Sequence, residues 1–306
     1  MNNQMNNFIL SRLWGGLGNQ MFQYALAKKL SILNGNIPIK LDTTYFKTYY
    51  RPYELDKLNI KAELASKEDI INLDNGSLNK KLARLIEKIP YIRVKDFIRR
   101  PFSKVYTEKS IRFDSNVFNI KPSIYLKGYW NSYKYFDDIR NELLEDFSFK
   151  GKMDEDNNRI ANLIANSNSS ISLHVRRGDY LTTKGARETF CSPYEDGFYD
   201  RAISFIEKKV DNPEFFLFSD EPDWVKDNLK INHKTTVIDI NKGDNSYWDL
   251  KLMSLCRHNI IANSTFSWWA AWLNENPDKI VLAPKGWMND KAFSIDDLIP
   301  KEWVIL

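Results

Sequence analysis

Short apolar runs alternate with helical patterns through the second half of the chain, and this alternation limits the possible folds most strongly. Apolar runs typical of buried strands occupy residues 171–175, 214–220, 235–240, 259–263 and 279–284. Helical patterns lie between them, at 198–210, near 221–229, and at 247–256 and 267–275. Strands that alternate with helices favour a parallel, doubly wound sheet.

The first residues repeat this alternation. An apolar run at 8–10 leads into a glycine-rich turn at 15–18, a helical stripe from Phe22 to Leu33, and a second strand at 37–42. A polar stretch at 147–170 separates the two halves. We therefore predict two Rossmann-like α/β domains in tandem, at 1–155 and 156–306, and expect the C-terminal tail to pack back on the first domain.

The composition excludes several classes of protein. The two cysteines, Cys191 and Cys256, indicate neither a disulfide framework nor a thiolate metal site. The three histidines are too dispersed for a metal motif, so no metal site is expected. The net charge of +4 is mild, and no nucleic-acid partner is expected. No stretch approaches the roughly 20 apolar residues of a membrane span, so we expect a cytoplasmic protein.

Two adjacent arginines end a predicted strand in the sequence HVRRGDY. His174 and Arg176 share one face of that strand, and Arg177, Gly178 and Asp179 follow. Ligands of open α/β sheets bind at the carboxyl ends of strands, and arginine matches phosphate oxygens bidentately. The pattern favours an anionic ligand, although an arginine pair tied to local carboxylates is an equally simple explanation.

A second candidate segment is NSTFSWW, which follows a strand and begins a helix. A helix N-terminus offers unpaired N–H groups and the positive end of a dipole, which suits phosphate. The alternative is ordinary N-capping by Ser264 or Thr265. The candidate residues are Asn263, Ser264, Thr265, Phe266 and Ser267.

The third segment is GGLGNQ. Gly16 and Gly18 begin a G-x-G-x-x-G pattern, but Met21 stands at the third glycine, and no G-K-[ST] follows. The turn still permits close approach of a ligand to the backbone. Asn19 and Gln20 carry amides that can hydrogen-bond sugar hydroxyls.

Weaker signals come from isolated acidic and polar residues. Ser219 and Asp220 end another predicted strand, and Asp249 could accept hydrogen bonds from a base. Asp154 and Asp156 have the D-x-D spacing of some metal-dependent transferases, but they lie in the polar junction and are interpreted as solvated charge.

A basic segment at 78–89 has an apolar stripe and a lysine-rich side. It is either a surface helix with a solvated face or a helix that lies on an anionic membrane surface. The second interpretation allows peripheral contact with the inner membrane surface.

Taken together and in this order, HVRRGDY, GGLGNQMFQYA and NSTFSWWAAWLN resemble the galactoside α-1,2-fucosyltransferases of glycosyltransferase family 11. FFLFSDEPDWV and YWDLKLMSLCRHNII extend the resemblance over nearly the whole chain. It implies a GT-B fold with a cleft between the domains, an acceptor-side N-terminal domain and a C-terminal domain that binds GDP-fucose. It further implies transfer of L-fucose with inversion to the 2-hydroxyl of a galactose-terminated acceptor, without cofactor or metal.

The resemblance also assigns roles to individual residues. Arg176 grips the β-phosphate, and His174 lies near the nucleoside. Asp249 recognises guanine. The helix-start hydroxyls flank the pyrophosphate, and Gly18, Asn19 and Gln20 lie beside the fucose. From the residues themselves, we expect Arg177 either to support the departure of the leaving group or to hold Asp179 in place.

Several alternatives stay open. Asp179 and Asp42 are both possible catalytic bases by placement. A nicotinamide oxidoreductase shares the fold, but it fits neither the incomplete glycine motif nor the arginine pair. A sugar-binding protein fits the many aromatic residues, and a fucosyltransferase of another linkage shares the donor motifs. The acceptor could be lactose, a lacto-N-biose end or a lipid-linked O-antigen unit.

Overall fold

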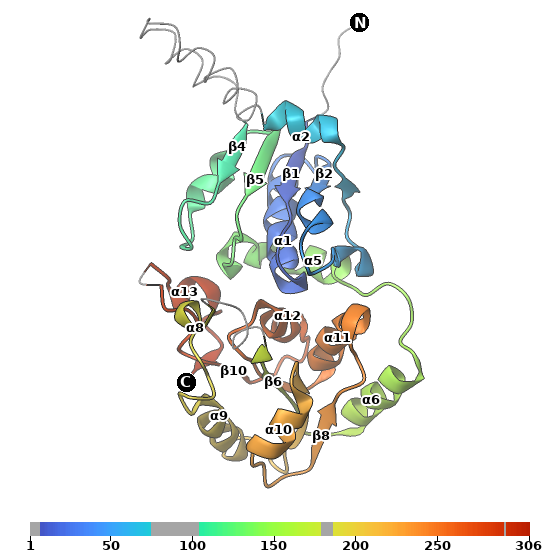
Figure 1. The fold of residues 1–306 in the computed structure, drawn as a ribbon, viewed down its shortest axis with the longest axis vertical. Helices are drawn as coiled ribbons and strands as arrows, with labels where there is room; N and C mark the ends of the chain where they lie inside the picture. Colours follow the sequence, from blue (N-terminus) through green and yellow to red (C-terminus); the bar gives the residue numbers. More distant parts are fainter. Residues whose placement is uncertain (1–6, 75–103, 179–185, 291) are drawn as a thin grey trace, which may run out of the picture.

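The computed structural model describes residues 7–74, 104–178, 186–290 and 292–306. Each of its two sheets is flanked by helices, and the two units lie one above the other in Figure 1. Asp179 and the basic segment at 78–89 lie outside the described residues. No described helix has both the length and the apolar character needed to cross a membrane.

The first sheet has five strands in the order β3-β2-β1-β5-β4, and all neighbours are parallel. The strands are β1 (Ile9–Arg12), β2 (Ile39–Asp42), β3 (Glu63–Leu64), β4 (Val105–Thr107) and β5 (Ile124–Lys127). The α-helices of this unit are α1 (Leu17–Leu33), α2 (Lys67–Leu73) and α5 (Arg140–Asp146). Short 3₁₀ turns occupy Thr44–Lys47, Leu55–Lys57, Ser115–Asn119, Tyr133–Tyr135 and Asp137–Ile139.

The second sheet has six parallel strands in the order β11-β10-β9-β6-β7-β8. They are β6 (Ser170–Val175), β7 (Glu214–Ser219), β8 (Thr235–Ile238), β9 (His258–Ile260), β10 (Val281–Ala283) and β11 (Val304–Ile305). Around them lie α6 (Glu155–Asn166), α8 (Ala186–Thr189), α9 (Phe198–Glu207), α10 (Pro222–Asn228), α11 (Tyr247–Leu255), α12 (Thr265–Leu273) and α13 (Ile295–Leu298), with a 3₁₀ turn at Gly243–Asn245.

The predicted α/β class with two parallel sheets is confirmed. The apolar runs of the second half form β6 to β10, and the helical patterns between them form α9 to α12. Strands β3, β4, β5 and β11 were not predicted. They are only two to four residues long, so their sequences show too little alternation to stand out.

An aromatic core joins the two units. Phe22 on α1 contacts Trp268 and Trp269 on α12, with ring centroids 4.7 Å and 5.0 Å apart. Phe136 stacks on Trp269 at 5.2 Å. All four side chains are buried. Because α1 belongs to the first sheet and α12 to the second, the tryptophans of the NSTFSWW motif serve as packing between the units.

The N-terminal turn of α1 approaches the N-terminus of α12 very closely. The indole Nε1 of Trp269 donates a hydrogen bond to the carbonyl of Gly18 at 2.9 Å. A Cβ on Gly18 would lie 2.5 Å from the backbone carbon of Thr265 and 2.7 Å from the backbone nitrogen of Phe266. Only glycine permits this approach of two backbones.

The C-terminal segment contacts the first unit as well as the second sheet. Asp297 on α13 accepts a hydrogen bond from the backbone N–H of Phe113 at 3.1 Å and forms an ion pair with Lys134 at 2.6 Å. Ser132 donates its hydroxyl to the carbonyl of Asp297. Downstream, β11 pairs with β10 at the edge of the second sheet.

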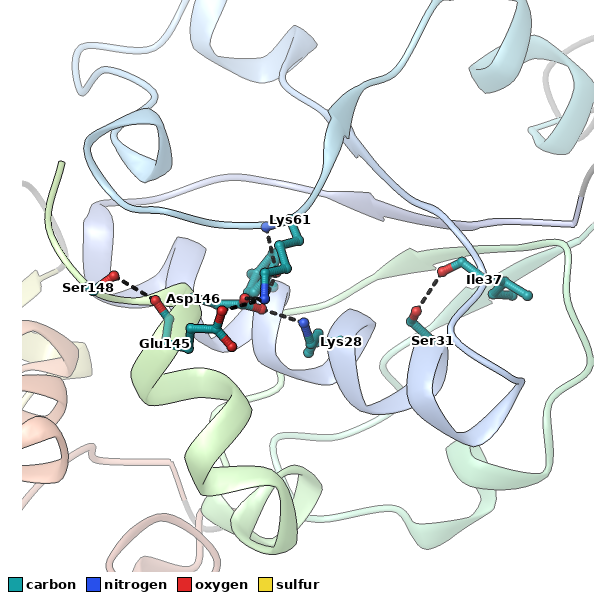
Figure 2. Close-up of polar contacts among 8 residues, drawn as sticks. Lys28, Ser31, Ile37, Lys61, Glu145, Asp146 and Ser148 are labelled. Carbon is teal, nitrogen blue, oxygen red and sulfur yellow. Dashed lines mark hydrogen bonds and ion pairs between the residues drawn. The ribbon is translucent and has the colours of Figure 1, made fainter.

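A buried carboxylate ties α5 to α1 within the first unit (Figure 2). Asp146 is fully buried, and its Oδ2 lies 2.6 Å from Lys28 Nζ and accepts a hydrogen bond from Tyr24 Oη at 2.6 Å. The backbone N–H of Lys61 donates to Tyr24 Oη in turn. Glu145 beside it points outward, with 70% of its side chain exposed.

Asp146→Asn is therefore expected to lower the free energy of unfolding by about 3–5 kcal/mol, because it leaves the ammonium of Lys28 without its buried counter-charge. Urea unfolding followed by circular dichroism measures this change. Glu145→Gln is the matched control and should have a much smaller effect, because the Glu145 carboxylate is exposed. Equal effects of the two variants would contradict the assignment.

Gly18→Ala should destabilise the protein by about 1–3 kcal/mol through overpacking against α12. In an ordinary helix the same change stabilises, because alanine has the higher helix propensity. Gly16→Ala provides the comparison, since its Cβ would meet only the flexible end of Arg51, at 3.0 Å. Thermal unfolding of both variants measures the difference, and a Gly18→Ala protein as stable as Gly16→Ala would refute the close-approach argument.

Candidate active site

A cleft of about 770 Å³ lies between the two units. Its lining comes from the carboxyl ends of strands in both parallel sheets, as expected for open α/β folds. From the first unit it includes Gly15, Gly16, Gly18, Asn19, Tyr49, Tyr50, Arg51, Glu54, Glu108, Tyr129 and Asn131. From the second it includes His174, Arg176, Ser219, Asp220, Asp239, Asn241, Asp249, Asn263, Ser264, Thr265 and Phe266.

Arg176 faces the cleft at the end of β6. Its Nε lies 3.4 Å from Oδ2 of Asp220, which follows β7. The same carboxylate accepts hydrogen bonds from the backbone N–H groups of Arg177 and Gly178, at 3.0 Å and 2.9 Å. Asp220 thus fixes the turn that carries Arg176, while the guanidinium of Arg176 still lines the cleft.

Arg177 is not among the residues that line the cleft. Its Nε donates to Glu221 at 3.0 Å, and its guanidinium lies 3.6 Å from the ring centroid of Trp224. The two arginines of HVRRGDY therefore play different parts. Arg176 lines the cleft, whereas Arg177 stabilises the turn through its contacts with Glu221 and Trp224.

His174 is a neutral imidazole at ordinary pH. It is buried, and burial together with the nearby charge of Arg176 lowers its pKa to about 3. Its Nδ1 has no hydrogen-bond partner among the described residues, although the ring lines the cleft. A buried polar atom in that position is suited to a ligand, since such groups are normally paired in proteins.

Two helix N-termini meet at the cleft. Helix α1 begins after Gly16, which offers no side-chain cap, and α12 begins after Ser264, whose hydroxyl accepts from Phe266 N–H at a long 3.4 Å. Each N-terminus carries a partial charge of roughly +0.5. With Arg176, they give this part of the cleft a positive potential suited to an anion.

Two of the predicted ligand contacts point elsewhere. Gln20 is fully buried and uses its amide on the carbonyls of Gly15 and Pro52 and on the N–H of Glu54. Ser267 is also buried, and its hydroxyl bonds back to the carbonyl of Ser264. Neither lines the cleft, so each supports the loop geometry without reaching a ligand.

Asp249 lies within the cleft at the start of α11. Burial raises the pKa of its carboxyl to about 7, although a hydrogen bond from Asn241 opposes the shift. Asn241 donates to Asp249 Oδ1 at 2.8 Å and exchanges two further amide hydrogen bonds with the buried Asn157 on α6. The carboxyl is thus held in place, and its charge depends on pH near neutrality.

Several lining residues of the first unit were not predicted. They are Tyr49, Tyr50, Arg51, Glu54, Glu108, Tyr129 and Asn131. Tyr49 to Glu54 fall within the aromatic and charged stretch TYYRPYE, which could have served as a signal. Glu108 and Asn131 follow the short strands β4 and β5, so no sequence pattern marked them as strand ends.

The structure shows where one of the two candidate bases lies. Asp42, one of two candidate bases, is buried and accepts hydrogen bonds from Tyr125 Oη and Thr44 N–H, away from the cleft lining. It is therefore not placed to reach an acceptor. Within the described ranges, no three His, Cys, Asp or Glu side chains gather in a way that could hold a metal ion.

The protein relatives that resemble this chain include a bacterial and a mammalian transferase. An α-1,2-colitosyltransferase of Escherichia coli is 31% identical over 304 residues, which is 97% of this chain and 98% of the relative. The galactoside 2-α-L-fucosyltransferase SEC1 of Bos taurus is 27% identical over 158 residues, which is 48% of this chain and 41% of the relative.

A solved structure of an Arabidopsis thaliana FUT1 mutant in complex with GDP shares the fold. Its TM-score is 0.53 at 12% identity, with 92% of this chain and 71% of that chain covered. The architecture is thus the GT-B arrangement of two Rossmann-like domains with a cleft between them. The model of glycosyl transferase family 11 matches residues 8–306. The chain therefore belongs to glycosyl transferase family 11 and is a glycosyltransferase.

Proposed function

We propose that this enzyme transfers L-fucose from GDP-fucose to the 2-hydroxyl of a terminal β-galactoside, with inversion at the fucose anomeric carbon and without a metal ion. The observation that carries the proposal is the convergence of Arg176 with the N-termini of α1 and α12 on one cleft. This arrangement supplies positive potential for a pyrophosphate from protein groups alone.

In the proposed reaction, the acceptor oxygen attacks the anomeric carbon and the bond to the β-phosphate oxygen breaks. Negative charge then develops on GDP. Arg176, oriented by Asp220 at 3.4 Å, would neutralise that charge, and the helix N-termini would add fixed dipoles. Gly18 and Asn19, at the start of α1, are assigned to the fucose.

The second domain is proposed to bind the nucleotide. Asp249 would accept hydrogen bonds from the N1–H and amino group of guanine, and neutral His174 would contact the nucleoside with its unpaired Nδ1. Ser264 and Thr265 at the start of α12 would flank the pyrophosphate. The acceptor would then occupy the first-domain side, which is lined by Tyr49, Tyr50 and Tyr129.

A second donor deserves a direct comparison. The Escherichia coli relative, similar over nearly the whole chain, is an α-1,2-colitosyltransferase. Colitose is fucose without its 3-hydroxyl, so GDP-colitose would satisfy the same pyrophosphate and guanine contacts. The discrimination between these donors depends on whether the site pairs the 3-hydroxyl, because a polar group left unpaired costs affinity.

The decisive experiment is transfer to lactose from GDP-fucose and, separately, from GDP-colitose, with EDTA present and the linkage determined by NMR. We expect an α-1,2 product from GDP-fucose without metal. A product from GDP-colitose alone would replace the donor assignment. Another linkage, or strict dependence on added divalent cations, would refute the corresponding part of the proposal.

Arg176→Ala separates a transferase from a sugar-binding protein. Its turnover should fall by about 10²–10³-fold, which is the usual loss when one charge-stabilising donor is removed. Arg201→Ala is the control, because Arg201 is exposed and pairs with Asp196 on the surface. A sugar-binding protein would keep glycan binding in both variants and show no turnover in the parent.

The affinity for GDP should depend on the charge of Asp249. Its pKa of about 7 means that the carboxyl is protonated below neutrality and cannot accept both guanine hydrogen bonds. Affinity is therefore expected to fall by up to about tenfold per pH unit as the pH drops below 7, and to level off above it. Isothermal titration calorimetry between pH 5.5 and 8.5 measures this.

The phosphate of GDP titrates in the same range, so a variant has to isolate the carboxyl. Asp249→Asn should weaken GDP binding at pH 8 and remove its part of the pH dependence. Asp227→Asn, on the exposed face of α10, should leave the pH profile unchanged. Parallel profiles for Asp249→Asn and the parent protein would exclude the guanine assignment.

A further inference from the structure

A carboxylate of the first domain faces the cleft with no role assigned to it so far. Glu108 follows β4, and its two oxygens accept hydrogen bonds from the backbone N–H groups of Tyr129 and Trp130, at 2.7 Å and 3.0 Å. A Cβ on Gly128 would lie 2.4 Å from Glu108 Cβ, so the loop after β5 is shaped around this side chain. Each oxygen keeps a second lone-pair site for another donor.

The loop that Glu108 holds has an unusual backbone. Trp130 has a φ of 59°, a left-handed conformation that a bulky side chain rarely adopts. Such strain is maintained only where the surroundings enforce it, and it is concentrated at functional sites. Here the strain positions the exposed ring of Tyr129 and the amide of Asn131, both of which line the cleft.

Two unpaired polar atoms belong to this loop and to a residue that packs against it. Among the described residues, Oδ1 of Asn131 and Nε1 of Trp14 are buried without a hydrogen-bond partner. Tyr129 packs its ring edge-on against Trp14 at 5.5 Å. An exposed aromatic ring beside a carboxylate and an amide is suited to a sugar, whose hydroxyls need polar partners and whose C–H face packs on aromatic rings.

The other first-domain carboxylate in the cleft is less available. Glu54 is buried, and its carboxyl accepts a hydrogen bond from the backbone of Leu17 at the start of α1. Burial raises the pKa of this carboxyl, and the nearby charge of Arg51 opposes the shift. Glu108 forms no ion pair with a described Lys or Arg, and burial raises the pKa of its carboxyl. Because burial raises the pKa of both carboxyls, the distinction between them rests on access: Glu108 is only partly buried, whereas Glu54 is buried.

We propose, on the basis of the proposed function, that Glu108 is the catalytic base and that Tyr129 and Asn131 hold the acceptor sugar against it. The acceptor oxygen forms its bond to the fucose anomeric carbon as the bond to the β-phosphate oxygen breaks. The electron pair of that bond leaves with GDP. The hydroxyl proton passes to a free lone pair of Glu108, which later releases it to water.

Glu108→Gln tests the base. Its kcat for transfer should fall by about 10²–10⁴-fold, the usual contribution of a general base, while its affinity for GDP stays within twofold of the parent. Glu63→Gln, at an exposed position of β3, is the control and should transfer at the parent rate. A folded Glu108→Gln protein that keeps more than a third of the parent kcat would overturn the assignment.

Tyr129→Ala tests the acceptor site without disturbing the backbone hydrogen bonds. Because its ring is 45% exposed, folding should survive, and the KM for lactose should rise about tenfold with GDP affinity unchanged. An unchanged KM for lactose would overturn the acceptor site even if Glu108→Gln failed to fold. If the parent enzyme transferred nothing to any galactoside, the proposed function itself would fail, which is a separate result.

Discussion

The contact between α1 and α12 is the constraint on which the site depends. Gly18 and Thr265 approach at backbone distance, and the indole of Trp269 fixes the pair through the Gly18 carbonyl. This contact places two helix N-termini from different domains on one cleft. Without it, each domain would present a single weak dipole, and the convergence of positive potential beside Arg176 would be lost.

The second domain could be predicted well from the sequence. Most of its strands are apolar runs buried on both faces, and turns separate them from the helices between them. The sequence therefore predicted β6 to β10 and α9 to α12. Arg176 and the NSTFSW segment could be placed because they come shortly after strands, and His174 because it lies in the last residues of β6. In a parallel sheet the carboxyl ends of all strands lie at the same edge of the sheet, so residues that follow strands lie on one side.

The rest of the site could not be predicted, for physical reasons. HVRRGDY does not reveal the contacts of Arg177, because its partners Glu221 and Trp224 lie 44 and 47 residues further along the chain. Gln20 looks like a ligand contact in GGLGNQ, yet its amide is used by the loop at Pro52. Glu108 depends on the pairing of β4 with β5, which such short strands do not reveal.

The contacts of Asp297 and the packing of α1 on α12 join the two units in dissimilar ways. One contact is the buried, tryptophan-rich core between α1 and α12. The other is polar: Asp297 forms an ion pair with Lys134 and accepts a hydrogen bond from the backbone N–H of Phe113. Both partners are close in sequence to the loops that carry Glu108 and Tyr129. Salt screens an ion pair of this kind but does not weaken the packing of buried aromatic rings. Salt therefore acts on one of the two contacts between the units and leaves the other unchanged.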